Sequence, residues 1–293
     1  MNAVTAFSAT DAGVCNAMSV DIEDWFQVGA FETVIDKADW PTLEARVERN
    51  TDAVLALFDE TGVKATFFTL GWVAQRHPAL IRRIVEAGHE IASHGWDHQR
   101  VFTMTADQFR ADLRAARNAI EDAAGVAVTG YRAPSFSIDQ RTPWAHAVLV
   151  EAGYRYSSSV APIAHDHYGW LDAPRQAFRP VAGADLIELP ITIARFAGRE
   201  MTTGGGFFRL FPGAIIDRAV RAANADGQRP AVFYFHPWEI DPGQPRVAQA
   251  PLKSRLRHYS RLGAMAGKLR TLIRAHQWGR VDGVVAVEAA RLP

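Results

Sequence analysis

The chain has 293 residues, of which 48% are hydrophobic and 22% are charged, so it can bury a sizeable core. Its single cysteine, Cys15, excludes an internal disulfide and a cysteine-based zinc site. The 32 basic and 32 acidic residues give a net charge of zero, but these charges are unevenly placed along the chain.

The N-terminal residues 1–17 contain neither the basic region nor the apolar run of a signal peptide. No stretch of the chain reaches the roughly 20 apolar residues that a membrane span needs. We therefore expect a cytoplasmic protein in which residues 1–17 form a leader segment ahead of the folded domain.

Short apolar strands alternate with amphipathic helices along most of the chain. We expect, in chain order, a strand at 14–22, a helix at 42–60, a strand at 64–70, a helix at 77–89, a strand at 89–94, a helix at 105–125, a strand at 129–134, a helix at 142–153, strands at 154–160 and 186–190, a helix at 212–227, a strand at 230–238, a basic helix and a final strand at 283–289. This alternation predicts an α/β protein with a parallel sheet, open or closed into a barrel. We expect one domain over residues 18–240 and a C-terminal basic extension over residues 241–293.

Ionisable side chains stand at the ends of several predicted strands, where ligands bind in parallel α/β folds. These residues are Asp21, Glu23, Asp24, His94, Arg132 and His236. In a regular strand Asp21 and Glu23 share one side, while Asp24 faces the other way unless a bulge turns it. Three crowded carboxylates repel one another and need a counter-charge, which a bound cation would supply. The alternative is a solvated turn between strand and loop.

The sequence HEIASHGWDHQR places His94 and His98 four residues apart. Two imidazoles and one carboxylate form a ligand set that leaves open positions on a zinc-like ion, as catalytic metal sites require. A second carboxylate could take a proton from water, and His236 could protonate a leaving group. Arg132 could orient the base carboxylate through a bidentate pair. Together these residues predict metal-assisted hydrolysis of an amide or ester.

Four motifs in this order resemble the polysaccharide deacetylases of the NodB-homology class, carbohydrate esterase family four. They are SVDIED, SHGWDH, RAPSFS and FYFHPWE, and the resemblance covers roughly residues 18 to 290. The segments VDIEDWFQ, GGGFFRLFP and HPWEID are similar to the subgroup associated with exosortase and exopolysaccharide gene clusters.

The resemblance implies a distorted (β/α) barrel of about seven strands, a divalent metal that is usually Zn²⁺, and removal of acetyl groups from N-acetylated sugars. It implies that Asp21 is the catalytic base, oriented by Arg132, and that His236 is the catalytic acid. His94 and His98 correspond to the metal-binding pair of the family.

The chain departs from the family pattern at two places. Where many members have adjacent aspartates, this chain leaves either Glu23 or Asp24 as the third metal ligand. Strand alternation favours Glu23, and the shorter, commoner ligand type favours Asp24. Ser157 stands where relatives often carry an aspartate that could tune the acid histidine.

Several residues near these motifs are candidates for contact with substrate. We expect Pro134, Phe136, Trp238 and Trp25 to line the substrate site. The aromatic members could stack on sugar faces or could equally belong to the core.

A basic block lies between Asp241 and Asp282, a window without any acidic residue. Its members are Arg246, Lys253, Arg255, Arg257, Arg261, Lys268, Arg270, Arg274 and Arg280. The rest of the chain has 23 basic and 32 acidic residues and therefore a net charge of −9. The block is either a solvated helix face or a contact for an anionic partner, such as a lipid-linked oligosaccharide or an anionic membrane surface. It lacks any motif that reads nucleic acid.

Apolar residues recur within this block at roughly helical spacing and predict a face that packs on the barrel. They are Leu256, Leu262, Met265, Leu269, Leu272 and Ile273.

The function favoured by the sequence is a metal-dependent hydrolase that removes N-acetyl groups from N-acetylhexosamine units of an exopolysaccharide or its lipid-linked precursor. The alternatives are an amidohydrolase of a small amide and a catalytically silent glycan-binding homologue. The sequence predicts no oligomeric state.

Overall fold

The computed structural model describes residues 14–164, 169–226 and 229–292, so most of the expected leader segment lies outside the described residues. Its strands are β1 (Asn16–Ile22), β2 (Thr66–Thr69), β3 (Glu90–Ser93), β4 (Gly130–Tyr131), β5 (Tyr156–Ser157), β6 (Ile187–Glu188), β7 (Ile193–Phe196), β8 (Arg199–Thr202), β9 (Val232–Phe235) and β10 (Trp278–Gly279). Its helices are α1 (Val47–Thr61), α2 (Gly71–Arg76), α3 (Pro78–Glu86), α4 (Ala106–Ala124), α5 (Ala145–Glu151), α6 (Gly205–Leu210), α7 (Gly213–Ala225), α8 (Leu252–Tyr259), α9 (Leu262–Ala275) and α10 (Val281–Ala289), with short 3₁₀ turns η1 (Lys37–Thr42), η2 (Val101–Thr103), η3 (Pro134–Phe136) and η4 (Pro237–Ile240).

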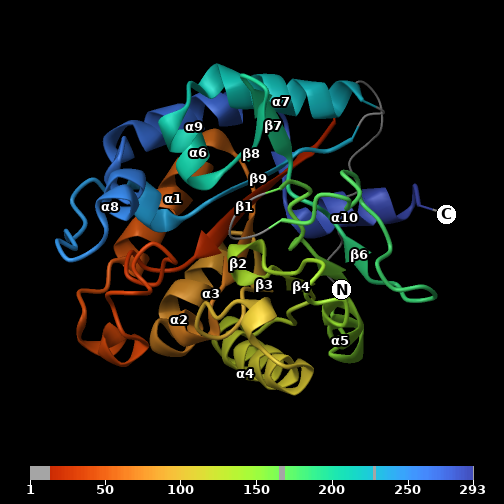
Figure 1. Ribbon diagram of the computed structural model, residues 1–293, viewed down its shortest axis with the longest axis horizontal. Helices are drawn as coiled ribbons and strands as arrows, with labels where there is room; N and C mark the ends of the chain where they lie inside the picture. The colour runs from red at the N-terminus through yellow and green to blue at the C-terminus, as the bar shows by residue number, and fades with distance from the viewer. Residues whose placement is uncertain (1–13, 165–168, 227–228, 293) are drawn as a thin grey trace.

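A parallel sheet runs through the centre of the molecule, and within the described residues its order is β10-β1-β2-β3-β4-β5-β6, with β9 also paired to β1. Strands β9 and β1 to β6 curl into a half-barrel, and Figure 1 shows helices α2 to α4 below them, α7 and α9 above them and α1 beside β1. Beyond β6 the chain returns to β9 at Thr192. The hydroxyl oxygen of Thr192 accepts a hydrogen bond from the N–H of Val232, the first residue of β9, at 2.8 Å. The predicted distorted (β/α) barrel of about seven strands is confirmed.

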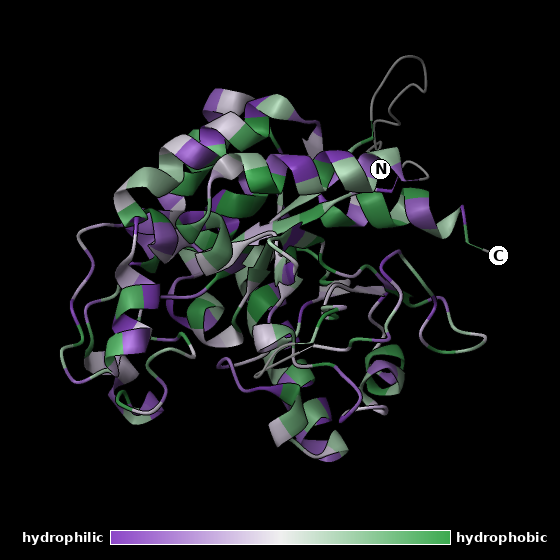
Figure 2. Cartoon of the chain, turned by 45° about the horizontal axis from the view of Figure 1, so that its top comes forward, coloured by the Kyte–Doolittle hydropathy of each residue, from purple (hydrophilic) through white to green (hydrophobic). Residues whose placement is uncertain are grey.

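The alternation of side chains along β1 produces two apolar clusters. Met18, Val20 and Ile22 point outward and pack with the surrounding helices. Ala17 points inward and packs with residues such as Phe68 on the opposite side of β1. In Figure 2 the central strands are mainly hydrophobic, whereas the outer helices carry both hydrophilic and hydrophobic residues. The barrel interior is therefore a packed core, into which the buried side chains of Ser19 and Arg132 also extend.

Helix α10 closes the amino-terminal end of the barrel, so the predicted final strand at 283–289 is wrong. The N–H groups of Val281 and Asp282 donate to the side chains of Thr66 and Glu90, which begin β2 and β3. Val281, Val284 and Val285 pack in the inner cluster of the barrel, whereas Val287 is exposed. The β-branched valines favour a strand at this position. A helix forms instead because it pairs its own backbone N–H and C=O groups where no neighbouring strand is available to do so.

Two predicted helices begin or continue differently in the structure. Helix α1 begins at Val47 and not at Thr42, because Thr42 ends the 3₁₀ turn η1 and the backbone of Leu43 after it is extended. The basic helix is divided into α8 and α9, and Arg261 between them has a left-handed backbone with φ 56°. Among the described residues, none of the helices combines the length and the apolar character needed to cross a bilayer.

The side chain of Tyr156 in β5 lies against Gly130 in β4 and leaves no space for a larger residue. A Cβ atom there would lie 2.0 Å from Cζ of Tyr156, whose hydroxyl donates to Glu90 at 2.8 Å. The close approach holds the short strands β4 and β5 in register.

We expect Gly130→Ala to lower the free energy of unfolding by about 1–3 kcal/mol, the usual cost of overpacking. The measurement is urea denaturation followed by circular dichroism. Gly263→Ala is the matched control, because no atom lies within 4 Å of its Cβ position and it sits inside α9. Equal stability of the two variants would contradict this account of the barrel wall.

Candidate active site

Asp21 and Arg132 form a buried ion pair at the carboxyl end of the barrel. Asp21 lies in β1, and Arg132, which follows β4, donates from Nη1 to Asp21 Oδ1 at 2.8 Å. The same nitrogen donates to Ser19 Oγ at 2.7 Å. Arg132 also donates from Nε and Nη2 to the backbone oxygen and hydroxyl of Ser158, both at 3.0 Å. These other partners explain why the expected bidentate pair is a single hydrogen bond.

Glu23, His94 and His98 come together beside this pair. One ligand atom from each of the three lies within 4.8 Å of the others. Nε2 of His98 is 3.1 Å from Oε2 of Glu23. Nδ1 of His94 contacts the carbonyl oxygen of Arg132 at 2.8 Å, which leaves Nε2 as the nitrogen that can bind a ligand. His98 has a left-handed backbone with φ 63°, a strained conformation of the kind that clusters at functional sites.

The chemistry of these three side chains fits a divalent metal. Oε2 of Glu23 is buried and has no hydrogen bond to any described residue, which is costly for a carboxylate without a cation. Burial raises the pKa of Glu23 to about 7. Burial lowers the pKa of His94 to about 4, so its imidazole is neutral at pH 7 and keeps a lone pair for a metal. Two imidazoles and a carboxylate match the donor set of catalytic zinc sites.

Asp24, the other candidate for third ligand, faces away from this cluster. Its Oδ2 accepts hydrogen bonds from the N–H groups of Arg46 and Val47 at 2.7 and 3.0 Å, and Oδ1 accepts from Trp25 N at 2.8 Å. The carboxylate thus caps the first turn of α1, whose N–H groups have no partner within the helix. Of the two residues that the sequence left open, only Glu23 lies with the histidines.

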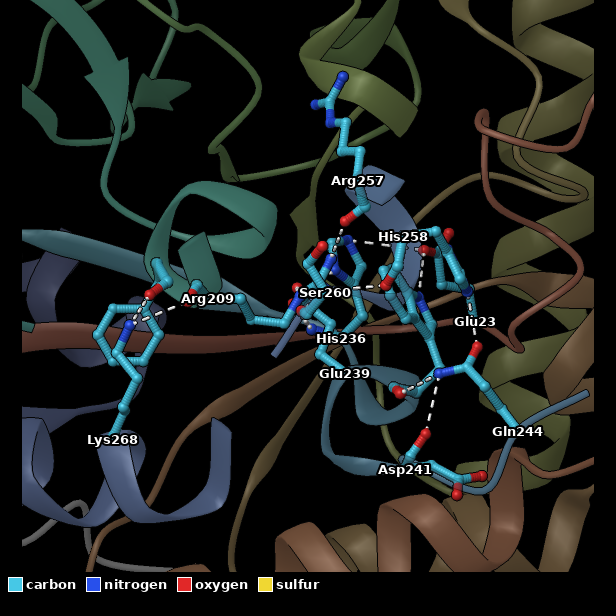
Figure 3. A network of polar contacts seen from close by, with 12 residues as sticks. Glu23, Arg209, His236, Glu239, Asp241, Gln244, Arg257, His258, Ser260 and Lys268 are labelled. Carbon is cyan, nitrogen blue, oxygen red and sulfur yellow. Dashed lines mark hydrogen bonds and ion pairs between the residues drawn. The ribbon is translucent and has the colours of Figure 1, made fainter. Parts of the chain in front are cut away.

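His236, at the end of β9, lies on the other side of Glu23. Its Nε2 is 3.6 Å from Glu23 Oε1, and its Nδ1 is 3.0 Å from Glu239 Oε2. Arg209 in α6 donates from Nε to Glu239 at 2.6 Å, which completes the chain of contacts in Figure 3. Burial lowers the pKa of His236, but the carboxylates of Glu23 and Glu239 outweigh it and raise this pKa to about 9. Burial likewise opposes the charge on Glu239, yet Arg209 and His236 lower its pKa to about 2.

The sequence did not single out Glu239 or Arg209, although both stand in quoted motifs. Glu239 is the last residue of FYFHPWE, three positions after His236, where the turn η4 folds it back. Arg209 is the only ionisable residue of GGGFFRLFP. Ser157, where an aspartate was expected, donates to Ser159 at 2.8 Å. The carboxylate that contacts Nδ1 of His236 comes from η4.

The four residues expected to line the substrate site are all buried. Trp238 contacts the cluster because its Nε1 donates to Glu23 Oε1 at 3.1 Å, and its ring stacks on His258 with centroids 4.2 Å apart. Trp25 donates to the Glu44 carbonyl oxygen, and Phe136 packs against Tyr234. Pro134 begins the turn η3. In this structure these side chains contribute packing, and Trp238 also donates a hydrogen bond to Glu23.

Two family models together match most of the chain. Residues 35–157 match the polysaccharide deacetylase family, and residues 158–286 match a domain of unknown function, DUF3473. The chain contains a polysaccharide deacetylase domain. The second match includes both the GGGFFRLFP segment and His236.

Individual relatives agree with this assignment. The peptidoglycan deacetylase of Helicobacter pylori is 33% identical over 107 residues, which is 36% of this chain and 36% of that protein. The match therefore spans about a third of this curated relative. A crystal structure of a putative polysaccharide deacetylase from Mycobacterium smegmatis aligns with a TM-score of 0.63 at 22% identity, covering 97% of this chain and 93% of that one. Puue allantoinase aligns with a TM-score of 0.59 at 16% identity, covering 95% and 91%, so the deacetylase domain shares its fold with an allantoinase.

Substitution of the two adjacent carboxylates should separate capping from metal binding. We expect Asp24→Ala to lower the free energy of unfolding by about 2 kcal/mol, because it leaves backbone N–H groups of α1 without an acceptor, and to keep the metal. Glu23→Ala should lose the metal instead. Zinc content and urea denaturation measure the two effects, and loss of metal from Asp24→Ala at unchanged stability would contradict the assignment.

Metal affinity should depend on pH through Glu23. Because its pKa is about 7 and a metal binds the deprotonated carboxylate, protons compete below that pH. We expect affinity to fall about tenfold for each pH unit below about 7, and to level off above it. Zinc titration against a competing chelator measures this. Glu23→Gln is the isosteric control and should bind zinc weakly, with an affinity that no longer changes near pH 7. A zinc affinity of the parent protein that does not depend on pH would contradict the role of Glu23.

Proposed function

We propose that the protein is a zinc-dependent deacetylase that removes N-acetyl groups from N-acetylhexosamine units of an exopolysaccharide or its lipid-linked precursor. The observation that carries this proposal is the position of Glu23, which has the metal-ligand pair His94 and His98 on one side and His236 on the other. Asp21, held by Arg132, lies at the same end of the barrel. The relatives named as deacetylases support the choice of the N-acetyl amide bond as the bond that is cleaved.

The side chains of the site have complementary roles in amide hydrolysis. A divalent ion held by Glu23, His94 and His98 would polarise the acetyl carbonyl and make water more acidic. Asp21 accepts the proton of the attacking water, and the hydrogen bond from Arg132 fixes which carboxylate oxygen is free to do so.

His236 supplies the proton that the leaving amine requires. With a pKa raised to about 9, its imidazole is protonated at neutral pH and can donate from Nε2. Glu239 accepts from Nδ1 and so fixes the orientation of the ring. A glycan-binding homologue without activity would need neither this acid nor the base opposite it.

We expect Asp21→Asn to keep zinc but to lower turnover by about 10²–10⁴-fold, the usual effect of removing a general base. His94→Ala should lose both zinc and turnover. The measurement is acetate release from N-acetylated oligosaccharides together with metal content.

Asp139→Asn is the matched control, because Asp139 is also a buried aspartate paired with an arginine, Arg141, but lies outside the cluster. It should retain turnover. Loss of zinc from Asp21→Asn would instead make Asp21 a ligand, and release of ammonia from a small amide in place of acetate would favour the alternative amidohydrolase.

A further inference from the structure

The basic block divides into paired and unpaired cations. In α9, Arg270 and Arg274 both pair with Glu60, at 3.0 and 3.1 Å. Lys268 donates to the carbonyl oxygens at the end of α6. The cations of α8 differ, because the side chains of Lys253, Arg255 and Arg257 are exposed and have no ion-pair partner in the part of the chain that the structure describes.

Two leucines stand among these cations on the surface of α8. Leu252 and Leu256 are 66% and 61% exposed, the highest values among the large hydrophobic side chains of the described residues. They are four residues apart and therefore share one face of the helix. The expectation that Leu256 packs on the barrel is wrong. A hollow of about 420 Å³ lies against this face, lined by Arg246, Leu252, Arg255, Leu256, Tyr259 and Ser260.

The opposite face of α8 is firmly packed, so the exposed face has a fixed orientation. His258 is buried, contacts Gln244 at 2.6 Å and stacks on Trp238. The carbonyl oxygen of Arg257 accepts a hydrogen bond from Arg209, while Figure 3 shows its guanidinium directed away from the network. Helix α8 is thus neither frayed nor loosely attached, and its leucines are exposed on a helix that is otherwise part of the fold.

We propose that the exposed face of α8, formed by Leu252, Lys253, Arg255, Leu256 and Arg257, docks on the surface of an anionic phospholipid bilayer. Cations between exposed leucines suit an interface in which apolar side chains enter the acyl boundary and charged side chains reach the headgroups. Between Asp241 and Asp282 the chain has no acidic residue, so α8 and its flanking segments add no negative charge that such a surface would repel. A nucleic acid would use the cations but not the leucines, so the lipid surface is the better match.

Docking in this orientation would place the bilayer near the carboxyl end of the barrel. The reason is that His258 of α8 stacks on Trp238, which donates a hydrogen bond to Glu23. If the proposed function holds, a lipid-linked glycan would then be presented at the rim of the site. The docking itself depends on neither metal nor substrate.

The test is flotation of the full chain with phosphatidylcholine vesicles that contain, or lack, phosphatidylglycerol. We expect binding only with phosphatidylglycerol and weaker binding as salt is raised. The triple variant Lys253→Gln, Arg255→Gln, Arg257→Gln should bind about 100-fold more weakly, since each cation near such a surface contributes about fivefold. The matched control also removes three positive charges, but from exposed arginines on α3, α4 and α7: Arg82→Gln, Arg114→Gln and Arg218→Gln. This variant should bind the vesicles as the parent protein does.

The leucines supply the second arm of the test. Leu252→Ser with Leu256→Ser should weaken binding by about tenfold at every salt concentration, since their apolar contribution is not screened. Circular dichroism shows whether each variant is folded. The proposal is overturned if the parent does not float with anionic vesicles at low salt, if the control triple loses as much affinity as the α8 triple, or if the chain binds a polynucleotide and no vesicle. Acetate release is not used, so failure of the proposed function would leave this result readable.

Discussion

The burial of the Glu23 carboxylate is the constraint on which the site depends. Only 2% of this residue is exposed, and its oxygens lie among the rings of His98, His236 and Trp238. A charged carboxylate in such surroundings is costly unless hydrogen bonds and a cation compensate it. The segments that follow β3 and β9 supply these neighbours, which is why residues far apart in the sequence meet at one point.

The compensation continues outward as a chain of alternating charges. His236 lies between Glu23 and Glu239, and Arg209 lies behind Glu239 with its remaining N–H groups on carbonyl oxygens at the junction of α8 and α9. Breaking one member of a buried ionic network leaves its partner uncompensated, so such networks are sensitive to every link. The C-terminal extension therefore belongs to the same electrostatic unit as the barrel, although it contributes none of the cluster's ligand atoms.

The sequence predicted those features that follow from local periodicity. Strand–helix alternation led to the barrel, and the period of two along β1 placed Asp21 and Glu23 on one side. It could not choose between Glu23 and Asp24, because the need of α1 for a capping acceptor appears only when Arg46 is brought beside Asp24. It missed Arg209, which is 30 residues from Glu239, since no local pattern reports a contact of that range. The valines of α10 were assigned to a strand because their β-branched side chains favour one, and only the closed end of the barrel explains the helix.

The boundary between the two matched segments falls between Ser157 and Ser158, at the end of β5. Arg132 belongs to the first segment but donates hydrogen bonds from two nitrogens to Ser158 of the second. Asp21 comes before both matched segments in the sequence. His236 comes from the second segment, whereas His94 and His98 come from the first. Exchange of either segment alone by recombination would therefore break contacts made by the other and separate His236 from His94 and His98.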